Sequence, residues 1–242
     1  MARLHDYDQH FLRSPRLVAE LVGHSNLRKN DLVYDFGAGS GVITSVLTRR
    51  VKQVVAVEQE PKALAQLKRN LAGSQNLRII NQDILSVELP NERYKVFSNI
   101  PFSLSSSLLR RLTSADNPPI AIYLIVQKQF ARKLEFGQHF TASLGVEISP
   151  WFTVRIRKPL RRSDFTPPPN VDTVLLEIKL REQPLLDMGE IDHWQRFISR
   201  CFAEQKYFGV CPRAEAGISV EKKPSELTQG QWLSLYKLKS KS

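Results

Sequence analysis

A glycine-rich segment at residues 35–41 is suited to form a ligand-binding turn. It reads DFGAGSG, lies at the end of a β-branched run and is followed by a segment of helical length. Glycine permits sharp turns and a close approach of backbone to ligand, and the start of the next helix offers free N–H groups. Dinucleotide sites need a further glycine at position 42, where this chain has Val. The G-x-G-x-G spacing after an acid is instead typical of S-adenosylmethionine binding, with a ligand-free structural turn as the alternative. The three glycines are Gly37, Gly39 and Gly41.

Two acidic residues further along fall where a nucleoside needs hydrogen-bond acceptors. Glu58 ends the second hydrophobic run, and a carboxylate there can accept from both ribose hydroxyls. Asp83 follows the third run and can accept from an adenine amine, while Ile84 offers an apolar surface to the ring. A single Asp after a strand is more often a turn former. The common order of glycine turn and two acids nevertheless favours a nucleoside site.

The next run ends in Asn99-Ile100-Pro101-Phe102, a motif suited to methylation of an adenine amine. That amine is a poor nucleophile because its lone pair is delocalised into the ring, and preorganised acceptors help by drawing it toward tetrahedral geometry. The Asn99 side-chain oxygen and the Ile100 carbonyl can act as these acceptors. Pro101 fixes the turn, and Phe102 can stack on the base. A plain turn with a buried Phe is the alternative interpretation.

The elements that carry these motifs alternate between short β-branched runs and amphipathic segments of helical length. The strand-like runs are 32–36, 53–58, 77–81, 94–98 and 120–126, and the helical segments are 41–50, 61–72 and 103–114. This order predicts an α/β fold, a Rossmann-like domain with a mostly parallel sheet. Motifs that follow successive parallel strands meet at one edge of such a sheet.

The composition indicates a polyanionic partner. Lys and Arg number 35 against 24 Asp and Glu, which gives a formal charge of +11 and an isoelectric point near 9.8. Looped or single-stranded RNA is favoured over a duplex, because adenine N6 is unreachable inside a helix. The predicted RNA contacts are Arg110, Arg111, Lys128, Arg132, Lys133, Arg155, Arg157, Arg161 and Arg162.

The pattern of elements changes near residue 180. An Arg- and Pro-rich loop at 157–170 lies between two strand-like runs, and loops of this length usually carry function. After 173–180 the strand pattern stops and two helical patterns follow. The sequence therefore predicts a catalytic domain over 1–180 and a small helical domain over 181–242, which is a candidate RNA-binding accessory.

Several classes of protein are excluded. The longest apolar runs fall far short of the ~20 residues that span a bilayer, and the N-terminal segment lacks the apolar region of a signal peptide. We therefore expect a cytoplasmic monomer without membrane contact. Cys201 and Cys211 form no C-x-x-C pair, and the five His residues show no ligand spacing, so no metal is expected. Cys201 is expected in the core.

Taken together, these residues resemble the rRNA adenine N6-methyltransferases, which include the Erm macrolide-resistance enzymes and the KsgA/Dim1 small-subunit dimethyltransferases. The resemblance runs from about residue 5 to 180 and also covers LIVQKQFA at 124–131. It implies that the Gln-Asn-Phe-Leu element, here Gln9, His10, Phe11 and Leu12, closes over the cofactor, with His10 in place of Asn. It also implies that Gln59 joins Glu58 at the cofactor, and that Phe165 faces Phe102 across a flipped adenine. From the residues alone, Phe165 serves equally well as a loop anchor in the core.

The choice between the two branches of this family depends on a few segments. FTPPPNVD at 165–172 is KsgA-like, whereas the NIPF turn and the segment after Phe202 are Erm-like. The Erm branch is favoured, which implies one adenine of 23S rRNA as substrate and resistance to macrolides, lincosamides and streptogramin B. Three alternatives remain, namely a small-subunit rRNA dimethyltransferase, a noncatalytic nucleic-acid-binding relative and a DNA adenine methyltransferase.

Overall fold

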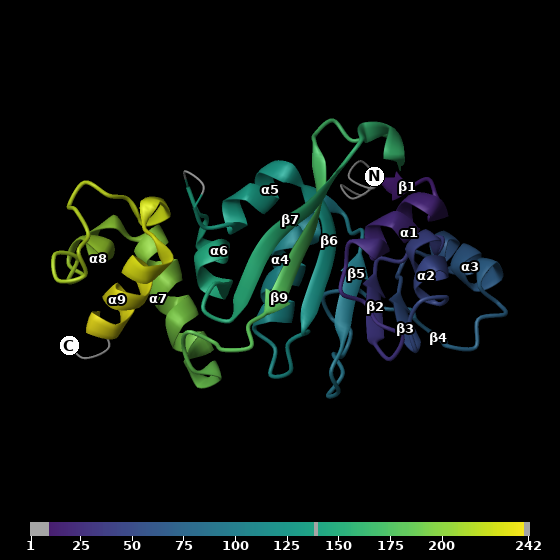
Figure 1. The fold of residues 1–242 in the computed structure, drawn as a ribbon, viewed down its shortest axis with the longest axis horizontal. Helices are drawn as coiled ribbons and strands as arrows, with labels where there is room; N and C mark the ends of the chain where they lie inside the picture. Colours follow the sequence, from purple (N-terminus) through teal and green to yellow (C-terminus); the bar gives the residue numbers. More distant parts are fainter. Residues whose placement is uncertain (1–9, 138–139, 240–242) are drawn as a thin grey trace. The chain divides into compact units, whose positions relative to one another are not determined.

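A seven-stranded sheet forms the centre of the computed structural model, which describes residues 10–137 and 140–239. The strand order is β4-β3-β2-β5-β6-β9-β7 (Figure 1). The strands are β2 (Leu32–Phe36), β3 (Gln53–Val57), β4 (Leu77–Ile80), β5 (Lys95–Ser98), β6 (Ala121–Gln127), β7 (Phe152–Leu160) and β9 (Thr173–Leu180). Strands β2 to β6 pair in parallel, and β9 pairs antiparallel with β6. The predicted α/β fold is confirmed.

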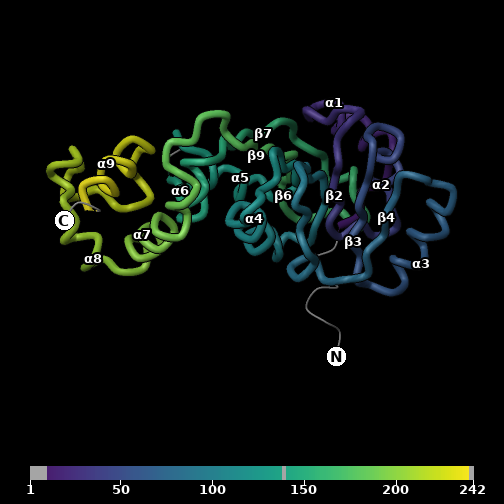
Figure 2. Tube along the Cα trace, turned by 90° about the horizontal axis from the view of Figure 1, so that it is seen from below, coloured from purple at the N-terminus to yellow at the C-terminus, as the bar shows by residue number. Residues whose placement is uncertain are grey.

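Helices cover both faces of the sheet. They are α1 (Pro15–Gly23), α2 (Val42–Leu47), α3 (Pro61–Asn70) and α4 (Ser105–Thr113). Figure 2 shows α1 and α4 on opposite sides of the strands. Proline occupies the first turn of α1 and of α3, where its missing N–H costs no hydrogen bond. The Glu60 side chain caps α3 by accepting from the N–H groups of Lys62 and Ala63. The Glu60 cap fixes where α3 begins after β3.

A small ribbon lies at the edge where the parallel strands end. Strand β1 (Phe11–Leu12) pairs antiparallel with β8 (Phe165–Thr166), and Leu12 stands opposite Phe165. In Figure 1 the turn that carries β8 lies beside β1. Within the predicted 157–170 loop, the structure therefore has the end of β7, a short 3₁₀ helix (Arg162–Asp164) and a strand.

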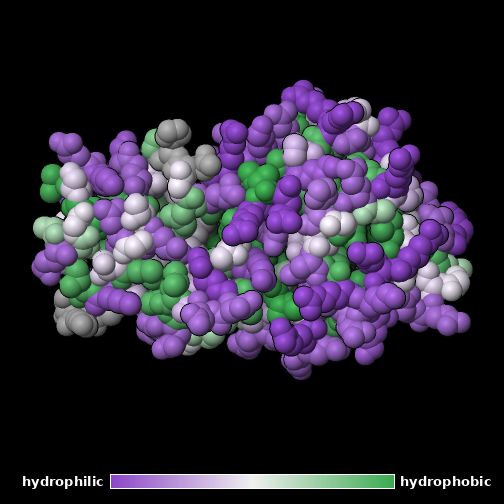
Figure 3. Space-filling view, in the orientation of Figure 1, coloured by the Kyte–Doolittle hydropathy of each residue, from purple (hydrophilic) through white to green (hydrophobic). Residues whose placement is uncertain are grey.

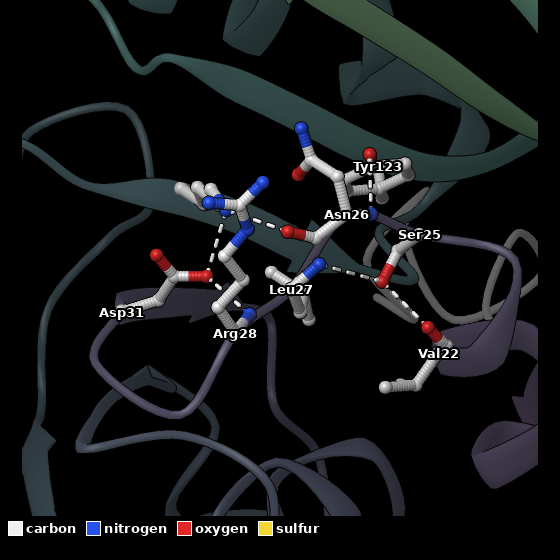
Figure 4. Close-up of polar contacts among 8 residues, drawn as sticks. Val22, Ser25, Asn26, Leu27, Arg28, Asp31 and Tyr123 are labelled. Carbon is white, nitrogen blue, oxygen red and sulfur yellow. Dashed lines mark hydrogen bonds and ion pairs between the residues drawn. The ribbon is translucent and has the colours of Figure 1, made fainter.

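A buried ion pair lies at the other end of the strands, where the parallel strands begin (Figure 4). The Lys95 ammonium, at the start of β5, donates to the Asp31 carboxylate and to the Asn26 carbonyl, each at 2.7 Å. The Tyr123 hydroxyl accepts from the Asn26 N–H at 2.9 Å, and burial raises the pKa of this phenol to about 12. Because α1, β2, β5 and β6 meet here, the strands that carry the candidate motifs start from a fixed base.

The chain forms two compact units. The first contains residues 1–129 and 155–180, and the second contains 130–154 and 181–242. The predicted boundary at 180 therefore misses the internal segment 130–154. The reason is side-chain packing: the indole N–H of Trp194 donates to the carbonyls of Val146 and Glu147, which joins α6 (Ser143–Ile148) to α7 (Ile191–Ala203).

Aromatic rings build the core of the second unit. Trp232 of α9 (Gln229–Lys239) is fully buried, stacks on Phe202 and meets Phe208 of α8 (Gln205–Gly209). Cys201 is also buried, which confirms its predicted place in the core.

Candidate active site

The glycine turn lies where β2 ends, and its backbone takes conformations that other residues rarely adopt. Gly39 has a φ of +57°, and a Cβ there would lie 3.4 Å from the Phe11 ring. At Gly41 a Cβ would lie 2.6 Å from the Leu67 side chain, so this glycine allows α2 to pack on α3. The turn thus requires glycine at two positions: at Gly39 because of the covering Phe11 ring, and at Gly41 because of the core side chains.

The acid that leads the turn faces inward. Asp35 is fully buried, and its Oδ2 accepts from the Thr44 hydroxyl at 2.6 Å. Its Oδ1 has no hydrogen-bond partner among the described residues. Burial, together with the nearby Glu58 charge, raises the pKa of Asp35 to about 7. Asp35 therefore joins β2 to α2 below the turn and does not reach the ligand side.

Glu58 connects the end of β3 to the turn. One carboxylate oxygen accepts from the Gly39 N–H at 2.7 Å and the other from the Glu60 N–H at 2.8 Å. The residue is 7% exposed. Each carboxylate oxygen can accept a second hydrogen bond, so Glu58 can hold the turn and still bind ribose hydroxyls.

The turn opens into a cavity of about 360 Å³. Ten of its lining residues were predicted: His10, Phe11, Gly37, Gly39, Glu58, Gln59, Ile84, Asn99, Ile100 and Pro101. The others are Glu60, Pro61, Ala63 and Leu104, which sequence reasoning missed. The signal that could have found three of them is Pro61, which starts a helix three residues after Glu58, because a helix that begins beside a site exposes its first turn to it.

The Asn99 side chain has a defined orientation in this cavity. Its amide nitrogen donates to the His10 carbonyl oxygen at 2.7 Å, and a carbonyl can only accept, so the side-chain oxygen remains available as an acceptor. The preceding Ser98 hydroxyl accepts from the Phe36 N–H at 2.8 Å, which joins the end of β5 to the end of β2. The catalytic turn and the glycine turn are therefore held side by side.

Three of the predicted cofactor residues that the structure describes do not line the cavity. Leu12 is buried under the ribbon, and Gly41 packs inward as described above. The exposed Asp83 uses one carboxylate oxygen to accept from the Leu85 N–H, the turn-forming role that competed with adenine binding. Gln9 lies outside the described residues.

The two aromatic residues predicted to flank the base, Phe102 and Phe165, differ in burial. Phe102 is half-buried and its ring centroid lies 5.6 Å from that of His10. Phe165 is fully buried in the main core beside Leu12. The prediction that Phe165 faces Phe102 across the base is therefore wrong for this conformation, and its alternative role as a loop anchor is the one observed. The physical reason is the β1–β8 register, which turns Leu12 and Phe165 to the same inner face.

Arg111, a predicted RNA contact, has hydrogen-bond partners within the fold. Its guanidinium donates to the carbonyl oxygens of Ile84, at 3.3 Å, and of Val87. Both carbonyls belong to the segment after Asp83, and Ile84 lines the cavity. A half-buried Arg with these two acceptors holds the cofactor side of the site.

Replacement of Arg111 by Gln should weaken S-adenosylmethionine binding about 10-fold, because a charge-assisted hydrogen bond contributes roughly 1.5–3 kcal/mol and both bonds hold the Ile84 wall. RNA binding should keep its salt dependence. Calorimetry with the cofactor and filter binding of rRNA across a salt series measure the two effects.

The matched control is Arg110→Gln, one position earlier on α4 and exposed. This variant should leave cofactor affinity unchanged. If Arg110 contacts a phosphate, the slope of log K for RNA binding against log salt concentration should become shallower by about 0.7. An Arg111 variant with normal cofactor affinity and a shallower salt dependence would restore the RNA role.

The other predicted RNA contacts fall into two groups, those that form an ion pair with a carboxylate and those that do not. Arg157 pairs with Glu177 at 3.3 Å, while Arg162 and Lys128 pair with Asp172 at 3.6 and 3.8 Å. In residues 10–137 and 140–239, no carboxylate partner is found for Arg132, Lys133, Arg155 or Arg161, all of which are exposed. Hydrophilic residues cover most of the face shown in Figure 3.

Two kinds of feature are absent from the described part of the chain. No cluster of three or more His, Cys, Asp or Glu residues has a geometry that could hold a metal ion. No helix there is both long enough and apolar enough to cross a membrane.

The sheet is mostly parallel, and it has a glycine turn after β2, an acid after β3 and an Asn-Ile-Pro-Phe turn after β5. This combination defines a methyltransferase that uses S-adenosylmethionine. The protein belongs to the ribosomal RNA adenine dimethylase family, whose profile matches residues 3–207. The predicted enzyme class and cofactor are confirmed.

Both branches of the family are found among similar proteins. An rRNA adenine N-6-methyltransferase of Bacillus licheniformis is 28% identical over 94% of this chain and 84% of its own length. A dimethyladenosine transferase of Yarrowia lipolytica is 29% identical over 83% of this chain, which spans 64% of that protein. The crystal structure of the 23S rRNA methyltransferase ErmE superposes with a TM-score of 0.81 at 26% identity and covers 95% of this chain and 99% of its own.

Proposed function

We propose that the protein methylates N6 of one adenine in 23S rRNA and thereby protects the ribosome from macrolides, lincosamides and streptogramin B. The observation that carries the methyl-transfer chemistry is the orientation of Asn99. Its amide nitrogen is bound to the His10 carbonyl, so its oxygen is the acceptor that it presents to a base amine. This acceptor lies in the same cavity as Gly39 and Glu58, which hold the methyl donor.

The residues of the cavity fit S-adenosylmethionine. Gly39 allows the backbone to approach the ligand, Glu58 has lone pairs left for the ribose, and buried Ile84 offers an apolar wall to the adenine. The cofactor supplies an electrophilic methyl group on its sulfonium. The protein needs only to hold the acceptor amine in line with it.

The acceptor side of the reaction uses fixed dipoles. The Asn99 side-chain oxygen and the Ile100 carbonyl accept hydrogen bonds from the two N–H groups of the target amine, which frees its lone pair for attack. Positive charge then develops on that nitrogen, and the same two oxygens stabilise it without reorganisation. After methyl transfer the amine nitrogen carries an extra proton, which passes to water, so no side chain has to act as a base.

Two observations support 23S rRNA as the substrate. The ErmE structure, named a 23S rRNA methyltransferase, matches nearly the full length of both chains. The Asn-Ile-Pro-Phe turn and the segment after Phe202 are also Erm-like. The FTPPPNVD segment and the dimethyladenosine transferase of Yarrowia lipolytica favour the second candidate, a small-subunit rRNA adenine dimethyltransferase.

RNA binding in this proposal involves both compact units. The exposed Arg110, Arg155 and Arg161 of the first unit contact phosphates, as do Arg132 and Lys133 of the second. The helical segment 181–242 acts as an accessory RNA-binding region. The protein works as a monomer in the cytoplasm.

Primer extension on rRNA from a macrolide-sensitive bacterium that expresses the protein tests this proposal. A dimethylated adenine cannot pair normally, so reverse transcriptase should stop at one new position in 23S rRNA, and the cells should gain resistance to all three drug classes. Cells that express the Asn99→Ala variant are the control and should show neither effect. A new stop in small-subunit rRNA alone would support the second candidate. No methylation of either rRNA in vivo or in vitro would contradict the proposal.

A further inference from the structure

A flipped base is held by stacking between aromatic or apolar side chains, and only one such side chain has been assigned at Asn99. Phe102 is half-buried at the start of the turn that follows Asn99, so it can form the first wall. Phe165 cannot form the second, since it is 0% exposed within the main core. If the proposed function is correct, the second face of the base is open to another side chain.

His10 is the ring that lies at this place. Its imidazole centroid is 5.6 Å from the Phe102 ring centroid, with 34° between the ring planes. Its own carbonyl oxygen accepts from the Asn99 amide, so His10 directly adjoins the group that would bind the target amine. Both His10 and Asn99 line the cavity.

The imidazole is held in position by the ribbon. Its Nδ1 lies 2.8 Å from the Pro167 carbonyl oxygen, and since a carbonyl only accepts, Nδ1 carries the hydrogen and donates it. The β1–β8 register pairs Phe11 with Thr166, which places His10 and Pro167 opposite each other one step further along. The buried Phe165 anchors this ribbon to the core, so it supports the imidazole through the backbone.

We propose that His10 supplies the second stacking face for the target adenine, opposite Phe102. A base stacked on both sides needs rings about 7–8 Å apart, because each contact is about 3.5–4 Å, so rings now 5.6 Å apart must separate by roughly 2 Å. Phe102 is half-buried and lies in a 3₁₀ turn outside the ribbon, so a rotation of its ring provides the space while the ribbon stays anchored. In this role His10 adds base recognition that an Asn at the same position would lack.

The experiment compares His10→Ala, His10→Phe and His10→Asn in methylation of the rRNA that the wild-type enzyme modifies, with tritiated S-adenosylmethionine as donor. Loss of one stacking face should lower kcat/KM for RNA about 5- to 150-fold in the Ala variant. The Phe variant keeps the face and should retain most of the activity. The Asn variant keeps a hydrogen-bonding group without the face and should resemble the Ala variant.

Cofactor affinity separates stacking from a purely structural role. Calorimetry measures the Kd for S-adenosylmethionine of each variant, and the stacking role predicts that kcat/KM for RNA falls in the Ala and Asn variants by far more than any change in that Kd. Thermal melting should show that all three variants fold. Thr166→Ala, a change at an exposed position on the same ribbon, is the matched control. It should change neither the Kd for S-adenosylmethionine nor the melting temperature.

Three results would overturn the role of His10: a fully active Ala variant, an Asn variant as active as wild type beside an impaired Phe variant, or a loss of cofactor affinity that accounts for the loss of activity. The second would mean that the imidazole only tethers the ribbon, and the third that it acts through the cofactor. A wild-type enzyme that methylates neither rRNA contradicts the proposed function instead, so the two failures can be distinguished.

Discussion

Replacement of Asn99 by Ala should lower the rate of methyl transfer about 100- to 1,000-fold, the usual effect of removing one preorganised group that stabilises transition-state charge. The side-chain oxygen is the acceptor that Asn99 presents to the target amine, because its amide nitrogen is bound to His10. Single-turnover methylation of rRNA measures the effect on chemistry, and calorimetry shows whether the cofactor still binds.

Asn99→Asp is the control for the other half of this side chain. A carboxylate keeps an acceptor for the target amine but cannot donate to the His10 carbonyl. The Asp variant should therefore lose far less activity than the Ala variant. If the Ala variant methylated RNA at the wild-type rate, the Asn99–Phe102 turn would not be the active site.

The second large effect is expected at the glycine turn, where Gly39→Val should weaken S-adenosylmethionine binding at least about 10-fold. Valine at a φ of +57° is strained by about 1–3 kcal/mol, and its Cβ would lie 3.4 Å from the Phe11 ring, with two methyl groups extending beyond it. Either the turn or the covering ring must move, and both belong to the cofactor cavity. Calorimetry on the purified variant measures the change in Kd.

Two companion variants show whether this loss is local. Gly73→Val has no atom within 4 Å of the new Cβ and an ordinary φ, so it should bind the cofactor normally. Gly39→Ala adds only the Cβ and should give an intermediate affinity. Normal cofactor binding by a folded Gly39→Val variant would contradict the assignment of this turn to the cofactor.

The local motifs could be predicted from the sequence because each depends on near neighbours in the chain. Residues 35–41 need glycines at fixed positions between a strand and a helix, and the alternation of β-branched runs with helical segments specifies a parallel sheet. In such a sheet the ends of successive strands share one edge, so Gly39, Glu58 and Asn99 were expected together and line one cavity.

The positions that the sequence did not determine depend on contacts between distant segments. Phe165 lies inside the core because β8 pairs with β1 in a register that no local pattern encodes. Arg111 resembles any exposed basic residue on α4 until the fold brings the carbonyls of Ile84 and Val87 to its guanidinium. The segment 130–154 belongs to the second unit because α6 packs against Trp194.

The sequence by itself thus determined the chemistry, that of methyl transfer to an adenine, through residue types and short spacings. Tertiary structure alone decided which side chains face the substrate, because a side chain's exposure depends on whatever long-range partner covers it. His10 shows this most clearly. Its type suggested a replaced cofactor contact, and only the fold brings its ring beside Phe102 and its carbonyl to Asn99, the contacts on which the proposed stacking role rests.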